Sequence, residues 1–99
     1  MDKDLKKMME LYFDPLKSTE EKSKAESLLR RRIRAVVEEL IEQEEIEKIQ
    51  HLEEQGMFGE RELEIFLKMS REKEKMESML WLMHLKNRKY GYHRKEFSF

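Results

Sequence analysis

The chain has 99 residues with a net charge of −1; 43 % of them are charged, 38 % are hydrophobic and none is cysteine. This length indicates one domain over residues 1–99, and the lack of cysteine excludes disulfides, thiolate nucleophiles and thiolate metal ligands. With one proline and three glycines, few residues can end a helix, and the polarity suits exposed helices with apolar stripes rather than a deep core. We therefore expect an all-α fold.

The first predicted helix covers about residues 2–13. Its apolar residues recur at helical spacing and form one face, made of Leu5, Met8, Met9 and Tyr12. Pro15 ends this helix, because a proline disfavours helical backbone at the residue before it. Ser18 and Glu21 then stand in the spacing of a capping box, which stabilises a helix start. A second helix is therefore predicted to begin at about residue 19.

The second predicted helix covers about residues 19–55, since no proline or glycine interrupts it before Gly56. Glycine is a common left-handed cap at the C-terminal end of a helix, so residues 56–59 are predicted to form a turn. A third helix covers about residues 60–89, and residues 90–99 form a basic, aromatic tail. These elements predict a long antiparallel helical hairpin with the short first helix packed on its base.

Each long predicted helix contains a polar run that divides its apolar stripe. The runs are Glu42–Glu45 and Ser70–Lys75, and the apolar faces before and after the first run are rotated away from each other. Folding about the turn would bring the runs to the same height, where Glu44 and Glu45 would face Arg71 and Lys73. We interpret the runs as a solvated waist at which the second helix kinks near residues 42–45. The alternative is a hinge or a surface to which a partner docks.

The long hairpin would also separate charge into two poles. Residues 38–54 contain eight glutamates and one lysine. Glu53 and Glu54 lie at a helix C-terminus, where the helix dipole disfavours acids, which indicates a compensating contact. The opposite end would gather nine cations, Arg30, Arg31, Arg32, Arg34, Lys86, Arg88, Lys89, Arg94 and Lys95. Because an antiparallel pair would place the acidic half of one copy against the basic end of the other, we expect a homodimer that forms a helical bundle.

These nine cations, called the basic patch below, are a candidate site for anions or nucleic acid. Cations neutralise phosphates by releasing counterions, and aromatic side chains of the tail could stack on unpaired bases, among them Tyr90, Tyr92, Phe97 and Phe99. No helix-turn-helix, zinc-finger or ribonucleoprotein motif accompanies them. The alternative is that the arginines form a solvated helix face that pairs in part with Glu26 and Glu38.

The predicted turn offers a second candidate, a tip that anchors a protein partner. Met57 and Phe58 lie between its two glycines, and a connecting segment normally lies at the surface. Exposed Met and Phe side chains at such a place indicate a binding site. The alternative is that Phe58 folds back onto Leu52, Leu63 and Phe66.

The methionine-rich face of the third predicted helix is the third candidate, a surface on which a partner helix docks. It consists of Met76, Met79 and Met83. Thioether side chains repack at little cost and therefore suit such a groove. The alternative is that this face is core, covered by the first helix or by the second copy.

Catalytic and metal sites have little support in the sequence. His51, His84 and His93 complete no metal-binding motif, and no phosphate loop or nucleophile elbow occurs. We therefore expect no catalytic residue, metal, cofactor or small-molecule substrate. No signal peptide or apolar stretch of membrane-spanning length is present, so we expect a cytoplasmic protein without membrane contact.

The sequence favours a non-enzymatic protein-interaction module, an accessory or regulatory subunit that binds another macromolecule. The first alternative is a small nucleic-acid-binding regulator that uses the basic patch. A third is a small helical-bundle enzyme whose arginines line an anion pocket.

Overall fold

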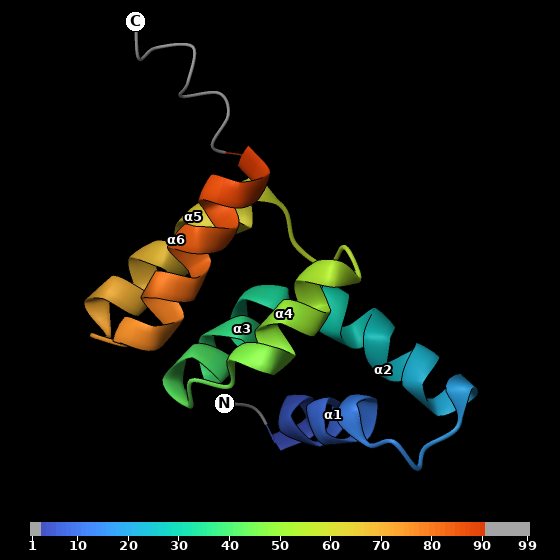
Figure 1. The fold of residues 1–99 in the computed structure, drawn as a ribbon. Coiled ribbons are helices and arrows are strands. Elements are labelled where there is room, and N and C mark those ends of the chain that lie inside the picture. The colour runs from blue at the N-terminus through green and yellow to red at the C-terminus, as the bar shows by residue number, and fades with distance from the viewer. Residues whose placement is uncertain (1–2, 91–99) are drawn as a thin grey trace, which may run out of the picture.

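The computed structural model describes residues 3–90, which form six helices and no strand (Figure 1). The helices are α1 (Lys3–Phe13), α2 (Thr19–Arg31), α3 (Ile33–Glu42), α4 (Ile46–Glu54), α5 (Glu60–Glu72) and α6 (Met76–Tyr90). The predicted all-α class is confirmed. The molecule measures 51 × 26 × 20 Å and is therefore elongated.

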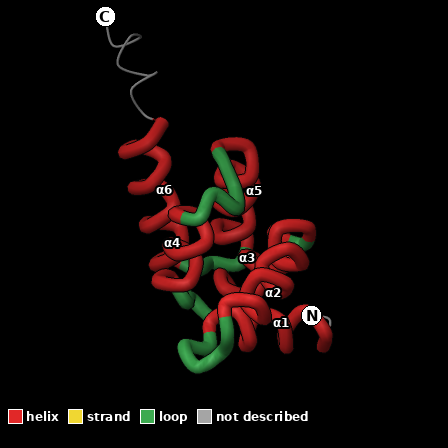
Figure 2. The backbone as a smooth tube through the Cα atoms, turned by 90° about the vertical axis from the view of Figure 1, so that its right-hand side faces the viewer, coloured by secondary structure: helices red, strands yellow, loops and turns green. Residues whose placement is uncertain are grey.

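The described helices pair into three helical hairpins that lie side by side, α1–α2, α3–α4 and α5–α6 (Figures 1 and 2). The α3–α4 hairpin is in the middle. On one side α1 packs against it, where the Tyr12 hydroxyl and His51 Nε2 form a hydrogen bond of 2.9 Å. On the other side α5–α6 packs against it, where Lys73 Nζ donates to Glu42 Oε1 over 2.6 Å.

The prediction of two long helices is wrong, although the kink expected near residues 42–45 lies where the chain reverses. Residues 19–55 form three helices, with a bend at Arg32 (φ −117°, ψ 31°) and a reversal at residues 43–45, and residues 60–89 are divided at residues 73–75. For the reversal at residues 43–45, the reason lies in the rotated apolar faces on either side of the first polar run. A straight helix would direct one face away from the core, whereas a reversal of the chain buries both.

Each reversal uses a glutamate in the left-handed conformation, Glu44 at φ 52° and Glu74 at φ 55°. Both turns have the two hydrogen bonds of a Schellman motif, including Glu45 N to Leu40 O and Lys75 N to Ser70 O, each 2.9 Å. This backbone costs a residue with a side chain about 1–2 kcal/mol relative to glycine. Burial of the apolar residues that follow each turn offsets this cost.

Other local predictions are confirmed. The Ser18 hydroxyl accepts a hydrogen bond from Glu21 N over 3.3 Å at the start of α2. Gly56 is the left-handed cap of α4, with φ 72°. The turn that follows joins the α3–α4 hairpin to the α5–α6 hairpin, and does not close one long hairpin as predicted.

The α3–α4 and α5–α6 hairpins repeat one arrangement at an offset of 30 residues. Glu74 corresponds to Glu44, the two left-handed turn residues, and Leu82 corresponds to Leu52. Both leucines are fully buried in the core shared by all three hairpins. Equivalent residues of the two hairpins can therefore be compared directly.

Candidate functional site

The outward side of α6 exposes a stripe of large apolar side chains. Met76 is 59 % exposed, Leu80 57 % and Met83 42 %, at the i, i+4, i+7 spacing of one helix face. The opposite side of α6 enters the core through Ser78, Leu82 and Leu85. We call the three exposed residues the α6 stripe, since an apolar patch on one face usually marks a binding site.

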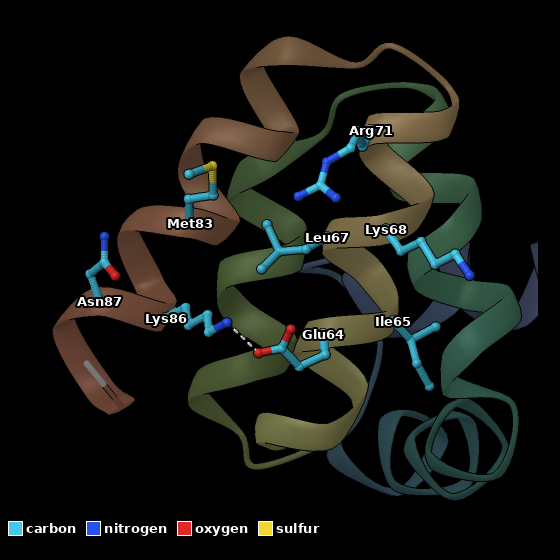
Figure 3. A pocket seen from close by; sticks show the side chains of 8 residues that line it. All are labelled: Glu64, Ile65, Leu67, Lys68, Arg71, Met83, Lys86 and Asn87. Atoms are coloured by element: carbon cyan, nitrogen blue, oxygen red, sulfur yellow. Dashed lines mark ion pairs between the residues drawn. The ribbon is translucent and has the colours of Figure 1, made fainter. Parts of the chain in front are cut away.

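A groove of approximately 580 Å³ lies next to the α6 stripe, between α5 and α6 (Figure 3). Its lining residues are Glu64, Ile65, Leu67, Lys68, Arg71, Met83, Lys86 and Asn87. Met83 therefore belongs both to the stripe and to this α5–α6 groove. In Figure 3 the side chains of Leu67 and Arg71 extend from α5 toward α6.

The α5–α6 groove combines an apolar floor with a positive rim. Ile65, Leu67 and Met83 supply apolar surface, whereas Lys68 and Arg71 are exposed cations. A third cation of the groove, Lys86, pairs with Glu64 across its end. The rim therefore keeps a net positive charge, which favours an acidic ligand with an apolar side.

The predicted docking methionines lie on this face of the molecule. Met76 and Met83 are exposed, while Met79 is half-buried and packs against the core. Leu80, Lys68 and Arg71 were not predicted as site residues. The spacing from Met76 to Leu80 to Met83 could have revealed the stripe, but the groove depends on the reversal at Glu74.

The structure brings two members of the basic patch, Arg30 and Lys89, to the end of α4. The Arg30 guanidinium donates to the carbonyl oxygens of Gln55 (2.9 Å) and Gly56 (3.3 Å) at the end of α4, and it also pairs with Glu26. Lys89 pairs with Glu53, which is only 7 % exposed, and this hydrogen bond raises the pKa of Lys89. These contacts are the compensation that acids at the end of α4 require.

Another cation of the basic patch, Lys86, lines the α5–α6 groove. Arg31, Arg32 and Arg34 are exposed around the bend between α2 and α3, and Arg88 is exposed on α6. Arg94 and Lys95 lie outside the described residues, as do Tyr92, Phe97 and Phe99. Arg30 and Lys89 thus lie among the acids at the end of α4, where the long hairpin had predicted an acidic pole without cations.

The tip prediction is also wrong with respect to exposure. Met57 and Phe58 are each only 7 % exposed. The Phe58 ring lies 5.1 Å from the Phe66 ring in an edge-to-face arrangement. The alternative therefore holds, in which Phe58 folds back onto the core.

The two polar runs do lie at the same height, although their contacts differ from those predicted. Lys73 pairs with Glu42 (2.6 Å) and Glu38 (3.5 Å). The Glu44 carboxylate accepts a hydrogen bond from Ser78 N, 3.4 Å away, in the first turn of α6. The polar contacts therefore link the middle hairpin to the third one.

The described histidines and carboxylates show no arrangement typical of metal binding. Residues 3–90 contain no group of three His, Cys, Asp or Glu side chains that could hold an ion. His51 is hydrogen-bonded to Tyr12, and burial raises the pKa of the Tyr12 phenol. Arg31, Arg32 and Arg34, proposed for an enzyme's anion pocket, line an open hollow of about 310 Å³ at the bend between α2 and α3, apart from the α5–α6 groove. In this same part of the chain, no helix has both the length and the apolar character needed to cross a bilayer.

Comparison with known protein families, with curated proteins and with solved structures gave no match. The function must therefore be inferred from the surface of this chain, and the outward face of the α5–α6 hairpin is its most distinctive part.

Proposed function

We propose that this chain is a non-enzymatic protein-interaction module, an accessory or regulatory subunit that binds a protein partner on the outward face of its α5–α6 hairpin. The observation that carries the proposal is the α6 stripe, in which Met76, Leu80 and Met83 are exposed side by side. Exposed apolar residues that occur singly are normal, but a row of three on one helix is typical of a binding surface.

The chemistry of the surrounding surface supports the same function. Two of the three stripe residues are methionines, whose flexible thioethers adapt to a partner's surface. The adjoining α5–α6 groove adds Ile65 and Leu67 as apolar contacts, with cations at the rim. Apolar contacts surrounded by charge are the usual composition of a protein interface.

The test is affinity capture by the immobilised full-length chain from lysate of the cells in which it occurs, with and without nuclease treatment. The wild type is compared with the double variant Leu80→Glu/Met83→Glu and with Leu16→Glu. Leu16 is the matched control, because it is 91 % exposed and lies in the loop between α1 and α2. We expect a partner that the wild type and Leu16→Glu retain and the stripe variant loses.

Purified partner and chain should then form a complex with the same dependence on the stripe. Retention of the same proteins by Leu80→Glu/Met83→Glu would contradict the proposal. Capture that disappears on nuclease treatment and depends on Arg31 and Arg34 would instead support the nucleic-acid alternative.

A further inference from the structure

The α3–α4 hairpin shows how a groove of this kind is filled. Four residues that line the α5–α6 groove are Leu67, Arg71, Met83 and Asn87. Their counterparts 30 residues earlier in the chain are Val37, Ile41, Glu53 and Met57. All four are buried, at 0 %, 0 %, 7 % and 7 % exposure respectively. On this side α5–α6 packs against α3–α4 and contributes Lys73 to Glu38 and Lys89 to Glu53. One hairpin thus docks on the next through apolar contacts and ion pairs at the rim.

The equivalent positions of α5–α6 are more exposed. Leu67 keeps the apolar character of Val37, but Arg71, Met83 and Asn87 are exposed, whereas their counterparts Ile41, Glu53 and Met57 are buried. Within residues 3–90, no further helix follows α6 to cover them. The outermost hairpin of a stack normally presents a polar surface, whereas α5–α6 presents an apolar stripe and groove among the described residues.

The charge at the rim of the α5–α6 groove is opposite to the charge at the equivalent place on the α3–α4 hairpin. Glu38, which binds Lys73 of the incoming hairpin, corresponds to Lys68 of the α5–α6 groove. Arg71 adds a second cation at the position of the apolar Ile41. A helix that presented a lysine here would be repelled, whereas a helix with an aspartate or glutamate would form ion pairs.

We infer that the α5–α6 groove is the docking site for an amphipathic helix with acidic side chains beside its apolar stripe, supplied by a partner protein. The inference deepens the proposed function and rests on it. The partner helix lies on Leu67 and Met83, and its acids pair with Lys68 and Arg71. α5 has 13 residues, so it offers a surface about 20 Å long, which a helix of similar length covers.

A second copy of the chain fits this groove less well. The helix that it would offer is α6, which carries the exposed stripe. Between Met76 and Tyr90 this helix has one acid, Glu77, against three cations, Lys86, Arg88 and Lys89. A basic helix against a basic rim is unfavourable, so charge complementarity selects a different, acidic partner.

The experiment is a selection from a displayed library of 18-residue helical peptides in which apolar stripe positions are fixed and the flanking positions vary over charged and neutral residues. The bait is the full-length chain. We expect the wild type to enrich peptides with Asp and Glu beside the stripe, and Lys68→Glu/Arg71→Glu to enrich Lys and Arg there. Lys68→Gln/Arg71→Gln, a milder change at the same exposed positions, should enrich neither.

The affinity of the best wild-type peptide is then measured by fluorescence anisotropy. Lys68→Glu/Arg71→Glu should weaken binding by about tenfold or more, and added salt should weaken wild-type binding. Met83→Glu should remove binding, while Leu16→Glu should leave it unchanged. Circular dichroism spectra that match the wild type will show that each variant remains folded.

Three results would overturn the inference. The first is a selection without preference for acidic peptides, and the second is binding that does not change with Lys68 and Arg71. The third is a dimer in sedimentation equilibrium that Met83→Glu dissociates, since a second copy would then occupy the face. The capture experiment separates this failure from failure of the proposed function: a captured partner that needs the α6 stripe but has no acidic helix leaves the function intact.

Discussion

The α3–α4 and α5–α6 hairpins are built alike but have different surroundings. Both reverse at a left-handed glutamate, and both bury a leucine at the same place in their second helix, Leu52 and Leu82. The middle hairpin is covered on two sides, by α1 and by α5–α6. The third hairpin is covered on one side and exposes the α6 stripe on the other. The same arrangement of two helices therefore forms part of the core in the α3–α4 hairpin and a candidate docking surface in the α5–α6 hairpin.

The difference shows how burial assigns a role to each residue. Glu53 of the middle hairpin is buried because Lys89 pairs with it, whereas Met83, its counterpart in the third hairpin, is 42 % exposed. At this position the middle hairpin has a buried carboxylate, Glu53, and the third hairpin has an exposed apolar side chain, Met83. That substitution is the opposite of what solvent exposure favours, and it supports binding as the function of this face.

The largest expected effect comes from truncating the two equivalent leucines. Leu52→Ala and Leu82→Ala should each lower the free energy of unfolding by about 2–5 kcal/mol, because both side chains are fully buried. The loss should be greater for Leu52, since α4 is held between neighbours while α6 can shift toward its open side. Urea denaturation measures both. A greater loss for Leu82→Ala would contradict the view that α5–α6 has an uncovered side.

A smaller effect is expected from the ion pair that covers the middle hairpin. Lys89→Met should cost about 1–2 kcal/mol, because it leaves the Glu53 carboxylate buried without its partner, although the 46 % exposure of the Lys89 side chain limits the loss. The double variant Glu53→Met/Lys89→Met should recover most of the loss. The matched control is Lys86→Met, whose partner Glu64 is 50 % exposed, with an expected change below about 0.5 kcal/mol. A double-mutant cycle with no coupling between Glu53 and Lys89 would refute this account.

Several features of the fold could be read from the sequence because they depend on nearby residues. Ser18 caps α2, Gly56 ends α4, and Pro15 lies just beyond the end of α1, as predicted. The joint position of the two polar runs was also predicted, and Lys73 with Glu42 confirms it. The caps rest on chemistry within a few residues. The two polar runs meet although the hairpins pack in parallel register, Glu42 with Lys73 and Glu53 with Lys89, and not in the antiparallel register that was predicted.

The reversals at Glu44 and Glu74 could not be read in the same way. A glutamate in left-handed backbone is locally unfavourable, and burial of distant residues such as Leu52 and Leu82 in one core selects it. The errors in the candidate site follow from this one. Without the long hairpin, Arg30 and Lys89 meet the acids at the end of α4, and the Gly56 turn becomes an internal connection that buries Phe58. The α6 stripe was predicted in part, through Met76 and Met83, because helical spacing survives when a long helix is divided.

The two reversals provide the next prediction. Glu74→Gly should stabilise the fold by about 0.5–1 kcal/mol, since glycine adopts the left-handed conformation without strain. Glu44→Gly should gain less, because it also removes the carboxylate that accepts from Ser78 N. Thermal unfolding of the two variants gives the comparison. Equal gains would mean that the contact between Glu44 and α6 contributes nothing to stability.

The smallest effect concerns pH at the junction of the two hairpins. A hydrogen bond from Lys73 holds the pKa of the Glu42 carboxyl below its ordinary value of 4.5, and the same contact raises the pKa of Lys73. A lowered carboxyl pKa stabilises the fold at pH values above the ordinary pKa of the group. This stabilisation is lost as the pH falls through the lowered pKa of the folded state. The stabilisation by Lys73 is lost at the alkaline side, as pH rises through its own raised pKa.

Carboxyl NMR titration tests this assignment at the single residue. Glu42 should titrate below its ordinary value in the wild type and return toward that value in Lys73→Met. The acid limb of thermal stability should shift by only a small amount, because Glu42 is exposed, Lys73 is only half-buried and solvent screens the pair. A Glu42 titration that Lys73→Met leaves unchanged would show that the third hairpin does not hold this contact in solution. The ion pairs of Lys73 with Glu38 and Glu42 could then no longer serve as the example for how a partner helix binds at the rim of the α5–α6 groove.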